Sequence, residues 1–192
     1  SGHCHRVELM LRLLGLPYET VEVDLLRGEH RTPAFLALNL LGQVPVLEDG
    51  ELVLADSNAI LVYLLRRYAP DSAWWPTEPL AAARLQRWFS LAAGLLDTGP
   101  ATARFSALIG RAITPHSQAH GQRLFELMEA ELLSGPWLLG AQISLADVSL
   151  YSYCSQAHIG GIDMAPYPRL RAWLARVEAL PGFLPMPAEL PS

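Results

Sequence analysis

Residues 42–65 read GQVPVLEDGELVLADSNAILVYLL, and this stretch decides how the front of the chain folds. Two apolar runs flank the Asp-Gly pair at 49–50, a dipeptide that favours a tight turn between antiparallel strands. The sequence therefore predicts a two-stranded hairpin within residues 44–54. Polar capping residues at 56–58 then precede an apolar run, so a helix that ends near Tyr68 should follow the hairpin.

The residues ahead of the hairpin add a helix, a strand and a second helix. Apolar side chains recur at i, i+3, i+4 and i+7 from Val7, as on one helix face, and Gly15 ends that helix. Residues 18–24 are rich in β-branched side chains and predict a strand, and residues 34–40 predict a short helix. Because a helix leading to a parallel strand normally completes a βαβ unit, we expect a further strand upstream of Ser1.

The composition changes after residue 70, and we expect a domain boundary there. Residues 71–79 are turn-like and predict a linker, and the remainder of the chain lacks strand periodicity. We therefore divide the chain into an α+β domain at 1–70, a linker at 71–79 and an all-helical domain at 80–192. The helices expected in the last part lie at 80–96, 98–114, 118–133, 144–156 and 168–180.

Composition and charge exclude several classes of function. The 192 residues are 51% hydrophobic and 17% charged, which suits a globular chain. The net charge is −5 and all 14 basic residues are arginine, with no basic stripe, so we do not expect nucleic acid as a partner. The apolar runs are too short to span a membrane. Two cysteines, Cys4 and Cys154, do not form a disulfide framework, which favours the cytosol.

The first candidate site is the run from Ser1 to Cys4, where the expected upstream strand would turn into the first helix. Backbone amides at a helix N-terminus stabilise an anion, and the Ser1 hydroxyl can donate a hydrogen bond to it. Ordinary helix capping by Ser1 is the alternative. Dithiol exchange needs Cys-x-x-Cys, and Ser1 occupies the first of these positions, so the pattern favours a structural Cys4.

The histidines do not predict a metal site. His3, Cys4 and His5 are consecutive, so they cannot easily converge on one tetrahedral ion. His116 and His120 stand at i and i+4 but lack the acidic residue of a metalloprotease motif. We therefore expect no metal cofactor.

Two further candidate sites border the hairpin. A cis bond between Val44 and Pro45 would turn the backbone groups of Val44 toward an extended peptide, whereas a trans proline at a strand start is equally compatible with the sequence. At the next helix start, Ser57 and the exposed amides suit a carboxylate, and Asp56 suits an ammonium group. Ordinary capping accounts for Asp56 and Ser57 as well.

Six segments, in order along nearly the whole chain, together resemble one family. They are SGHCHRV (1–7), GLPYE (15–19), RGEHRTPAF (27–35), NLLGQVPVLEDG (39–50), LADSNAILVYL (54–64) and SLADVSLY (144–151). This combination is similar to the bacterial cytosolic glutathione transferases. The resemblance implies a thioredoxin-like domain that binds glutathione as co-substrate, an all-helical domain with a hydrophobic second-substrate pocket, and a homodimer.

The resemblance also implies a role for each candidate residue. Ser1 would hydrogen-bond the glutathione thiolate, with His3 and Cys4 as its neighbours, although His3 departs from the residue that relatives often carry. The residues expected to bind the rest of glutathione are His30, Gln43, Val44, Pro45, Asp56 and Ser57. Those expected in the second-substrate pocket are Trp88, Phe105 and Leu108, for which core packing is the alternative.

The implied activity is thiolate attack on a small hydrophobic electrophile, as in a glutathione S-transferase. Glutathione-dependent isomerisation, and peroxide or disulfide reduction, would use the same thiolate with a different second pocket. A non-catalytic binding or scaffold protein on the same fold is an alternative of another class. Ser144 and Asp147 form a capping-box pattern, to which we assign a folding role.

Overall fold

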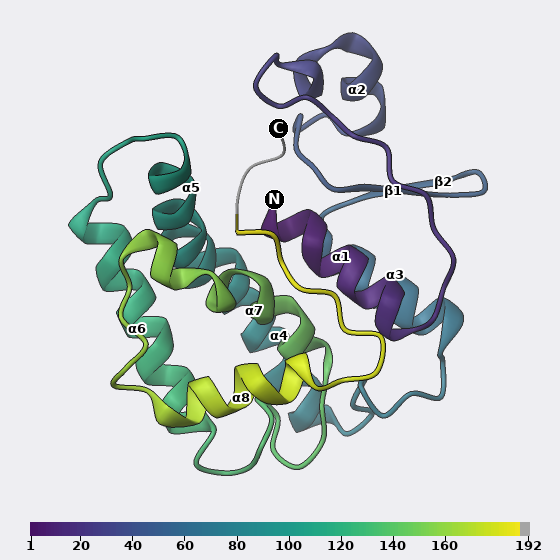
Figure 1. The fold of residues 1–192 in the computed structure, drawn as a ribbon. Coiled ribbons are helices and arrows are strands. Elements are labelled where there is room, and N and C mark those ends of the chain that lie inside the picture. Colours follow the sequence, from purple (N-terminus) through teal and green to yellow (C-terminus); the bar gives the residue numbers. More distant parts are fainter. Residues whose placement is uncertain (189–192) are drawn as a thin grey trace.

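The computed structural model describes residues 1–188, and it has two parts that lie side by side (Figure 1). The front part consists of α1 (Gly2–Leu13), η1 (Glu29–Arg31), α2 (Pro33–Leu38), β1 (Val46–Asp49), β2 (Leu52–Ala55) and α3 (Ser57–Tyr68). The back part consists of α4 (Pro79–Leu91), η2 (Ala92–Ala101), α5 (Thr102–Leu108), α6 (Pro115–Glu131), α7 (Leu145–Ser155), η3 (Ala157–Gly160) and α8 (Pro168–Glu178).

The predicted hairpin and the helix after it are confirmed. Strands β1 and β2 pair antiparallel from Val46 opposite Ala55 to Asp49 opposite Leu52. The Asp49 carboxylate accepts hydrogen bonds from the hydroxyls of Tyr63 and Tyr68 on α3. The hairpin is thereby tied to the helix that follows it.

The strand predicted over residues 18–24 is wrong for this structure. Within residues 1–188 the β1–β2 pair is the only sheet, and residues 18–24 have no ladder partner. Val21 in this segment is 86% exposed. Strand formation requires hydrogen bonds to a neighbouring strand, and no described residue supplies them for this segment.

The helical prediction for the back part is confirmed in type, with one difference in detail. Helix α4 runs directly into η2, a ten-residue π-helical segment that contains Pro100. Proline has no backbone N–H to donate, so Pro100 interrupts the helical hydrogen bonding of this segment. The hydroxyls of Thr98 and Thr102 add bonds nearby, to the carbonyls of Gly94 and Asp97. Such segments often occur at functional sites.

Helix α7 forms the centre of the molecule. Its residues from Leu145 to Cys154 are all buried, and it contacts α1 and α3 of the front part as well as α4 and α8. One hydrophobic cluster runs through both parts. No helix within the described residues has the combined length and apolar character that a membrane span requires.

His5 ties α1 to the C-terminal segment and is 4% exposed. Its Nε2 lies 2.9 Å from the Leu184 carbonyl oxygen, and its Nδ1 lies 2.8 Å from the Ser152 hydroxyl. Because a carbonyl only accepts, Nε2 carries the hydrogen and Nδ1 accepts from Ser152. Burial lowers the pKa of His5 from 6.5 to about 4, so the folded protein holds this imidazole neutral.

We expect this histidine to make the protein less stable in mild acid. The unfolded chain takes up a proton on His5 below pH 6.5, whereas the folded chain resists it until about pH 4. His5 therefore lowers the free energy of unfolding as the pH falls from 6.5 to 4, by up to about 3 kcal/mol. Urea unfolding across this range measures the effect. His5→Gln retains a donor for Leu184, and a pH dependence equal to that of the wild type in this variant would contradict the assignment.

Candidate functional site

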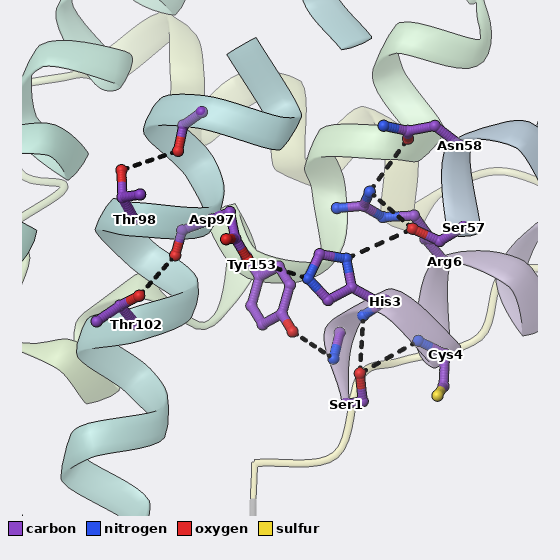
Figure 2. Close-up of polar contacts among 12 residues, drawn as sticks. Ser1, His3, Cys4, Arg6, Ser57, Asn58, Asp97, Thr98, Thr102 and Tyr153 are labelled. Carbon is purple, nitrogen blue, oxygen red and sulfur yellow. Dashed lines mark hydrogen bonds and ion pairs between the residues drawn. The ribbon is translucent and has the colours of Figure 1, made fainter. Parts of the chain in front are cut away.

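A group of polar side chains lies where the front and back parts meet, and we call it the junction cluster (Figure 2). It joins the N-terminal ends of α1 and α3 to η2 and α7. Its members are Ser1, His3, Arg6, Ser57, Asn58, Asp97, Ser149 and Tyr153.

Ser1 begins α1 as its N-cap. The Ser1 Oγ accepts hydrogen bonds from the amides of His3, at 3.2 Å, and Cys4, at 3.4 Å. Both bonds use the oxygen as an acceptor, so the hydroxyl hydrogen can still donate to a ligand. The capping function that the sequence left as an alternative is therefore present, and it is compatible with anion binding.

Gly2 allows α1 to approach α7 closely. The Gly2 amide donates to the Tyr153 hydroxyl oxygen at 3.1 Å. A Cβ atom at this position would lie 2.6 Å from the Tyr153 ring, closer than van der Waals contact allows. The glycine therefore lets the aromatic ring sit against the first turn of α1.

Cys4 is half-buried, and burial raises the pKa of its thiol, although the hydrogen bond with Ser1 acts in the opposite direction. The Cys4 thiol is therefore protonated at neutral pH. A protonated thiol is a weak nucleophile and a weak metal ligand. Within residues 1–188, no three His, Cys, Asp or Glu side chains gather where they could hold a metal ion.

The start of α3 combines a strained backbone with a buried hydroxyl. Asp56 has a φ of 72°, in the left-handed region that non-glycine residues rarely adopt, while its Oδ1 accepts from the Ala59 amide at 2.8 Å. Backbone strain of this kind is concentrated at functional sites. Ser57 is 5% exposed, and its Oγ lies 3.4 Å from Nδ1 of His3.

The Val44–Pro45 bond is cis, one of the two alternatives that the sequence left open. The residue before it, Gln43, is exposed, and its carbonyl accepts from the Asn39 side chain at 2.7 Å. Next to it, Gly42 lies so close to the backbone of His30 that a Cβ would approach the His30 carbonyl oxygen to 3.0 Å. The loops that carry His30 and Gln43 are therefore adjacent.

His3 connects the two parts of the molecule. Its Nε2 lies 3.2 Å from Oδ1 of Asp97 on η2, and its ring meets the Tyr153 ring edge-on at 5.1 Å. The hydrogen bond from His3 lowers the pKa of Asp97, which therefore remains a carboxylate at neutral pH. While Nε2 faces Asp97, Nδ1 on the other side of the His3 ring faces the Ser57 hydroxyl.

Sequence reasoning missed five members of this cluster as site residues, namely Arg6, Asn58, Asp97, Ser149 and Tyr153. Arg6 follows the Ser1–Cys4 run by two residues, but nothing in the local pattern indicates that it is buried. Asp97 and Tyr153 are separated from Ser1 by almost a hundred residues or more. The one available signal is Pro100 in an otherwise helical run, which predicts a local irregularity near Asp97.

The pocket residues predicted for the back part do not all suit that role. Trp88 is 1% exposed, and its indole N–H donates to the Leu138 carbonyl at 3.2 Å. It is a core residue and cannot line an open pocket, which corrects the prediction for Trp88. Phe105 on α5 is 54% exposed and Leu108, one turn later, is half-buried, so both are accessible from solvent.

Comparisons with known proteins agree with this arrangement of a small α/β part and a helical part. Residues 1–67 match the sequence model of the glutathione S-transferase N-terminal domain, and residues 111–176 match that of the C-terminal domain. Human glutathione S-transferase theta-2 is 33% identical over 178 residues, which cover 88% of this chain and 73% of the relative.

Solved structures agree as well. The crystal structure of a glutathione S-transferase from Pseudomonas fluorescens has a TM-score of 0.87 and 38% identity, covering 97% of this chain and 94% of that one. A glutathione transferase homologue from Drosophila mojavensis, solved with bound glutathione, has a TM-score of 0.84 and 30% identity, covering 94% and 84%.

These matches define the class of protein as one with a thioredoxin-like front domain and a helical back domain. The chain belongs to the glutathione S-transferase family.

Proposed function

We propose that the chain activates the thiolate of glutathione for attack on a small hydrophobic electrophile. The observation that carries this proposal is that two capped helix N-termini meet at His3. The His3 amide bonds to the Ser1 hydroxyl at 3.2 Å, and the His3 ring lies 3.4 Å from the Ser57 hydroxyl. Helix N-termini with hydroxyl donors suit anions, and glutathione carries a thiolate and carboxylates.

Each residue near these two helix starts has a proposed role. Ser1 donates to the thiolate, with His3 and Cys4 beside it. Val44 pairs with the cysteinyl backbone next to Pro45. The γ-glutamyl end is held by Asp56 and Ser57, the glycyl end lies near His30 and Gln43, and the second substrate lies against Phe105 and Leu108.

Lowering the thiol pKa of glutathione requires only a modest free energy of stabilisation. A thiol of pKa about 8.5 is only ~3% ionised at pH 7, and lowering that pKa by two units requires roughly 2.7 kcal/mol of preferential thiolate stabilisation. A charge-assisted hydrogen bond contributes about 1.5–3 kcal/mol, and a helix N-terminus about 0.3–1 kcal/mol more. Ser1 and the first turn of α1 together are therefore sufficient. The thiol proton leaves to solvent. The sulfur lone pair then forms the bond to the electrophilic carbon, while the bond from that carbon to its leaving group breaks and the leaving group departs with the electron pair.

Ultraviolet difference spectroscopy tests the proposal, because a thiolate absorbs where a thiol does not. We expect the thiol of glutathione bound to the wild type to titrate about two pH units below that of free glutathione. An unchanged thiol pKa on binding would contradict thiolate activation. A panel of electrophiles, isomerisable substrates, peroxides and disulfides, each assayed with glutathione, then separates conjugation from the other thiolate reactions.

We also propose the division into a glutathione-binding domain at 1–70, a linker at 71–79 and a helical domain at 80–192. The family membership supports a cytosolic homodimer. Sedimentation at micromolar concentration measures the oligomeric state.

A further inference from the structure

Arg6 lies directly behind the start of α3 and is 1% exposed. Its Nη1 donates to the Ser57 hydroxyl oxygen at 3.2 Å and to Oδ1 of Asn58 at 3.1 Å, as Figure 2 shows. Burial lowers the pKa of Arg6 to about 10, so the guanidinium is still charged at neutral pH. A full positive charge is therefore buried beside one of the two helix starts that we propose to bind glutathione.

Among the described residues, no counter-charge is in contact with Arg6. None of the ion pairs closer than 4.0 Å within residues 1–188 involves Arg6. Its Nε and Nη2 are buried without a hydrogen-bond partner among the described residues. The carboxylates of Asp56 and Asp97 act on it only through longer-range attraction. An uncompensated buried cation is costly, and a ligand anion would offset that cost.

The hydrogen bond from Arg6 also determines the direction in which the Ser57 hydroxyl can donate. Because Nη1 of Arg6 donates to the Ser57 oxygen, the Ser57 hydroxyl hydrogen must point elsewhere. In this structure the acceptor nearest to it is Nδ1 of His3, at 3.4 Å, which is long for a hydrogen bond. The hydroxyl is thus oriented as a donor with a weak partner, and a ligand carboxylate would be a better acceptor.

Asn58 fixes the guanidinium in this position. Its Oδ1 accepts from Arg6 and also from the Ser149 hydroxyl on α7, at 2.6 Å. The arginine is thereby held between α3 of the front part and α7 of the back part. A side chain that is held at two acceptors and carries a charge can orient a neighbouring donor without moving itself.

We propose that Arg6 is a positioning residue for substrate recognition, which orients the Ser57 hydroxyl and supplies the positive charge that selects the α-carboxylate of the γ-glutamyl group. This inference rests on the proposed function, because it assumes that glutathione binds at Ser57. Arg6 does not touch the ligand, since it lies beneath Ser57 and is closed off from solvent. Its effect is carried by the hydroxyl and by the electric field of the buried charge.

Binding of two thiols tests this role. The first is glutathione, and the second is 4-aminobutanoyl-cysteinylglycine, which lacks the α-carboxylate and is otherwise the same molecule. Titration calorimetry on the wild type and on Arg6→Met gives four affinities. We expect the wild type to prefer glutathione, and we expect Arg6→Met to weaken the binding of glutathione about a hundredfold, the size that a charge several ångström away gives at an effective dielectric near 20. The affinity for the analogue should change little between the wild type and Arg6→Met.

Arg104→Met is the matched control. Arg104 on α5 is also buried, at 5% exposed, and also has an unpartnered Nε, but it donates to the Pro187 carbonyl and not to Ser57. Its replacement should leave the preference for glutathione unchanged. Because Met fills a similar volume without a charge, we expect thermal unfolding of Arg6→Met to occur near the wild-type temperature.

The outcomes separate the two proposals. A wild type that binds neither thiol overturns the proposed function, and the role of Arg6 with it. If the wild type prefers glutathione but Arg6→Met lowers the affinity for both thiols equally, only the role of Arg6 is overturned. If Arg6→Met does not fold, Arg6→Gln removes the charge and keeps an N–H donor, and a loss confined to glutathione supports the role whereas an equal loss for both thiols, or no loss, contradicts it.

Discussion

Replacing Asp147 with alanine is expected to lower the free energy of unfolding by about 3–5 kcal/mol, because the buried carboxylate satisfies several donors at once. Asp147 is 0% exposed. Its Oδ1 accepts from the Leu138 amide at 3.0 Å and from the Trp173 indole N–H at 2.8 Å. Its Oδ2 accepts from the amide and the hydroxyl of Ser144, at 2.8 and 3.1 Å.

These bonds hold three separate parts of the back domain on one carboxylate. The bonds from Ser144 belong to the capping box that starts α7. The other two bonds hold the backbone at Leu138 and helix α8 against the start of α7. Without the carboxylate, the buried donors have no acceptor, and each unsatisfied group costs about 1–3 kcal/mol. The start of the central helix and its packing against α8 should weaken together.

Urea unfolding followed by tryptophan fluorescence measures this prediction. Ser144→Ala is the comparison, because it removes the cap hydroxyl but leaves the carboxylate, and it should cost only about 1 kcal/mol. A loss in Asp147→Ala no larger than that in Ser144→Ala would show that the indole and the Leu138 amide find other partners.

The features that could be predicted from the sequence are those determined by neighbouring residues. The hairpin depends on Asp49-Gly50 between two apolar runs, and the Ser144–Asp147 capping box spans four residues, so each could be found in a short window. The strand at 18–24 could not be judged in this way. Its local pattern suits a strand, but pairing depends on a partner that no residue of the described chain supplies.

The junction cluster could be predicted only in part, for a physical reason. Ser1 and Ser57 lie at helix starts, where backbone amides make any serine a candidate. Asp97 and Tyr153 reach the site only because η2 and α7 pack against α1, and no spacing in the sequence encodes that contact. Trp88 shows the converse, since an aromatic residue on a predicted helix face is suited equally to a pocket and to the core.

Removing the Ser1 hydroxyl should affect catalysis more than any other single change at the proposed site. If the site lowers the thiol pKa of glutathione by about two units, Ser1→Ala returns it toward about 8.5. The fraction of thiolate at pH 6.5 would then fall from about one half to about one hundredth. We expect kcat/KM for conjugation to fall about 50-fold at pH 6.5 and less than about twofold at pH 9.

The pH dependence distinguishes thiolate stabilisation from a structural defect, because Ser1 is also the N-cap of α1. Thr114→Ala is the matched control, since Thr114 caps α6 by accepting from the Ser117 amide at 3.1 Å and lies outside the junction cluster. Both variants lose one cap and should lose a similar amount of stability, about 1 kcal/mol. Steady-state rates from pH 6 to 9 compare them. Only Ser1→Ala should lose activity, and the loss should be confined to low pH. A defect in folding or in the second-substrate pocket would instead lower the rate equally from about pH 6 to 9.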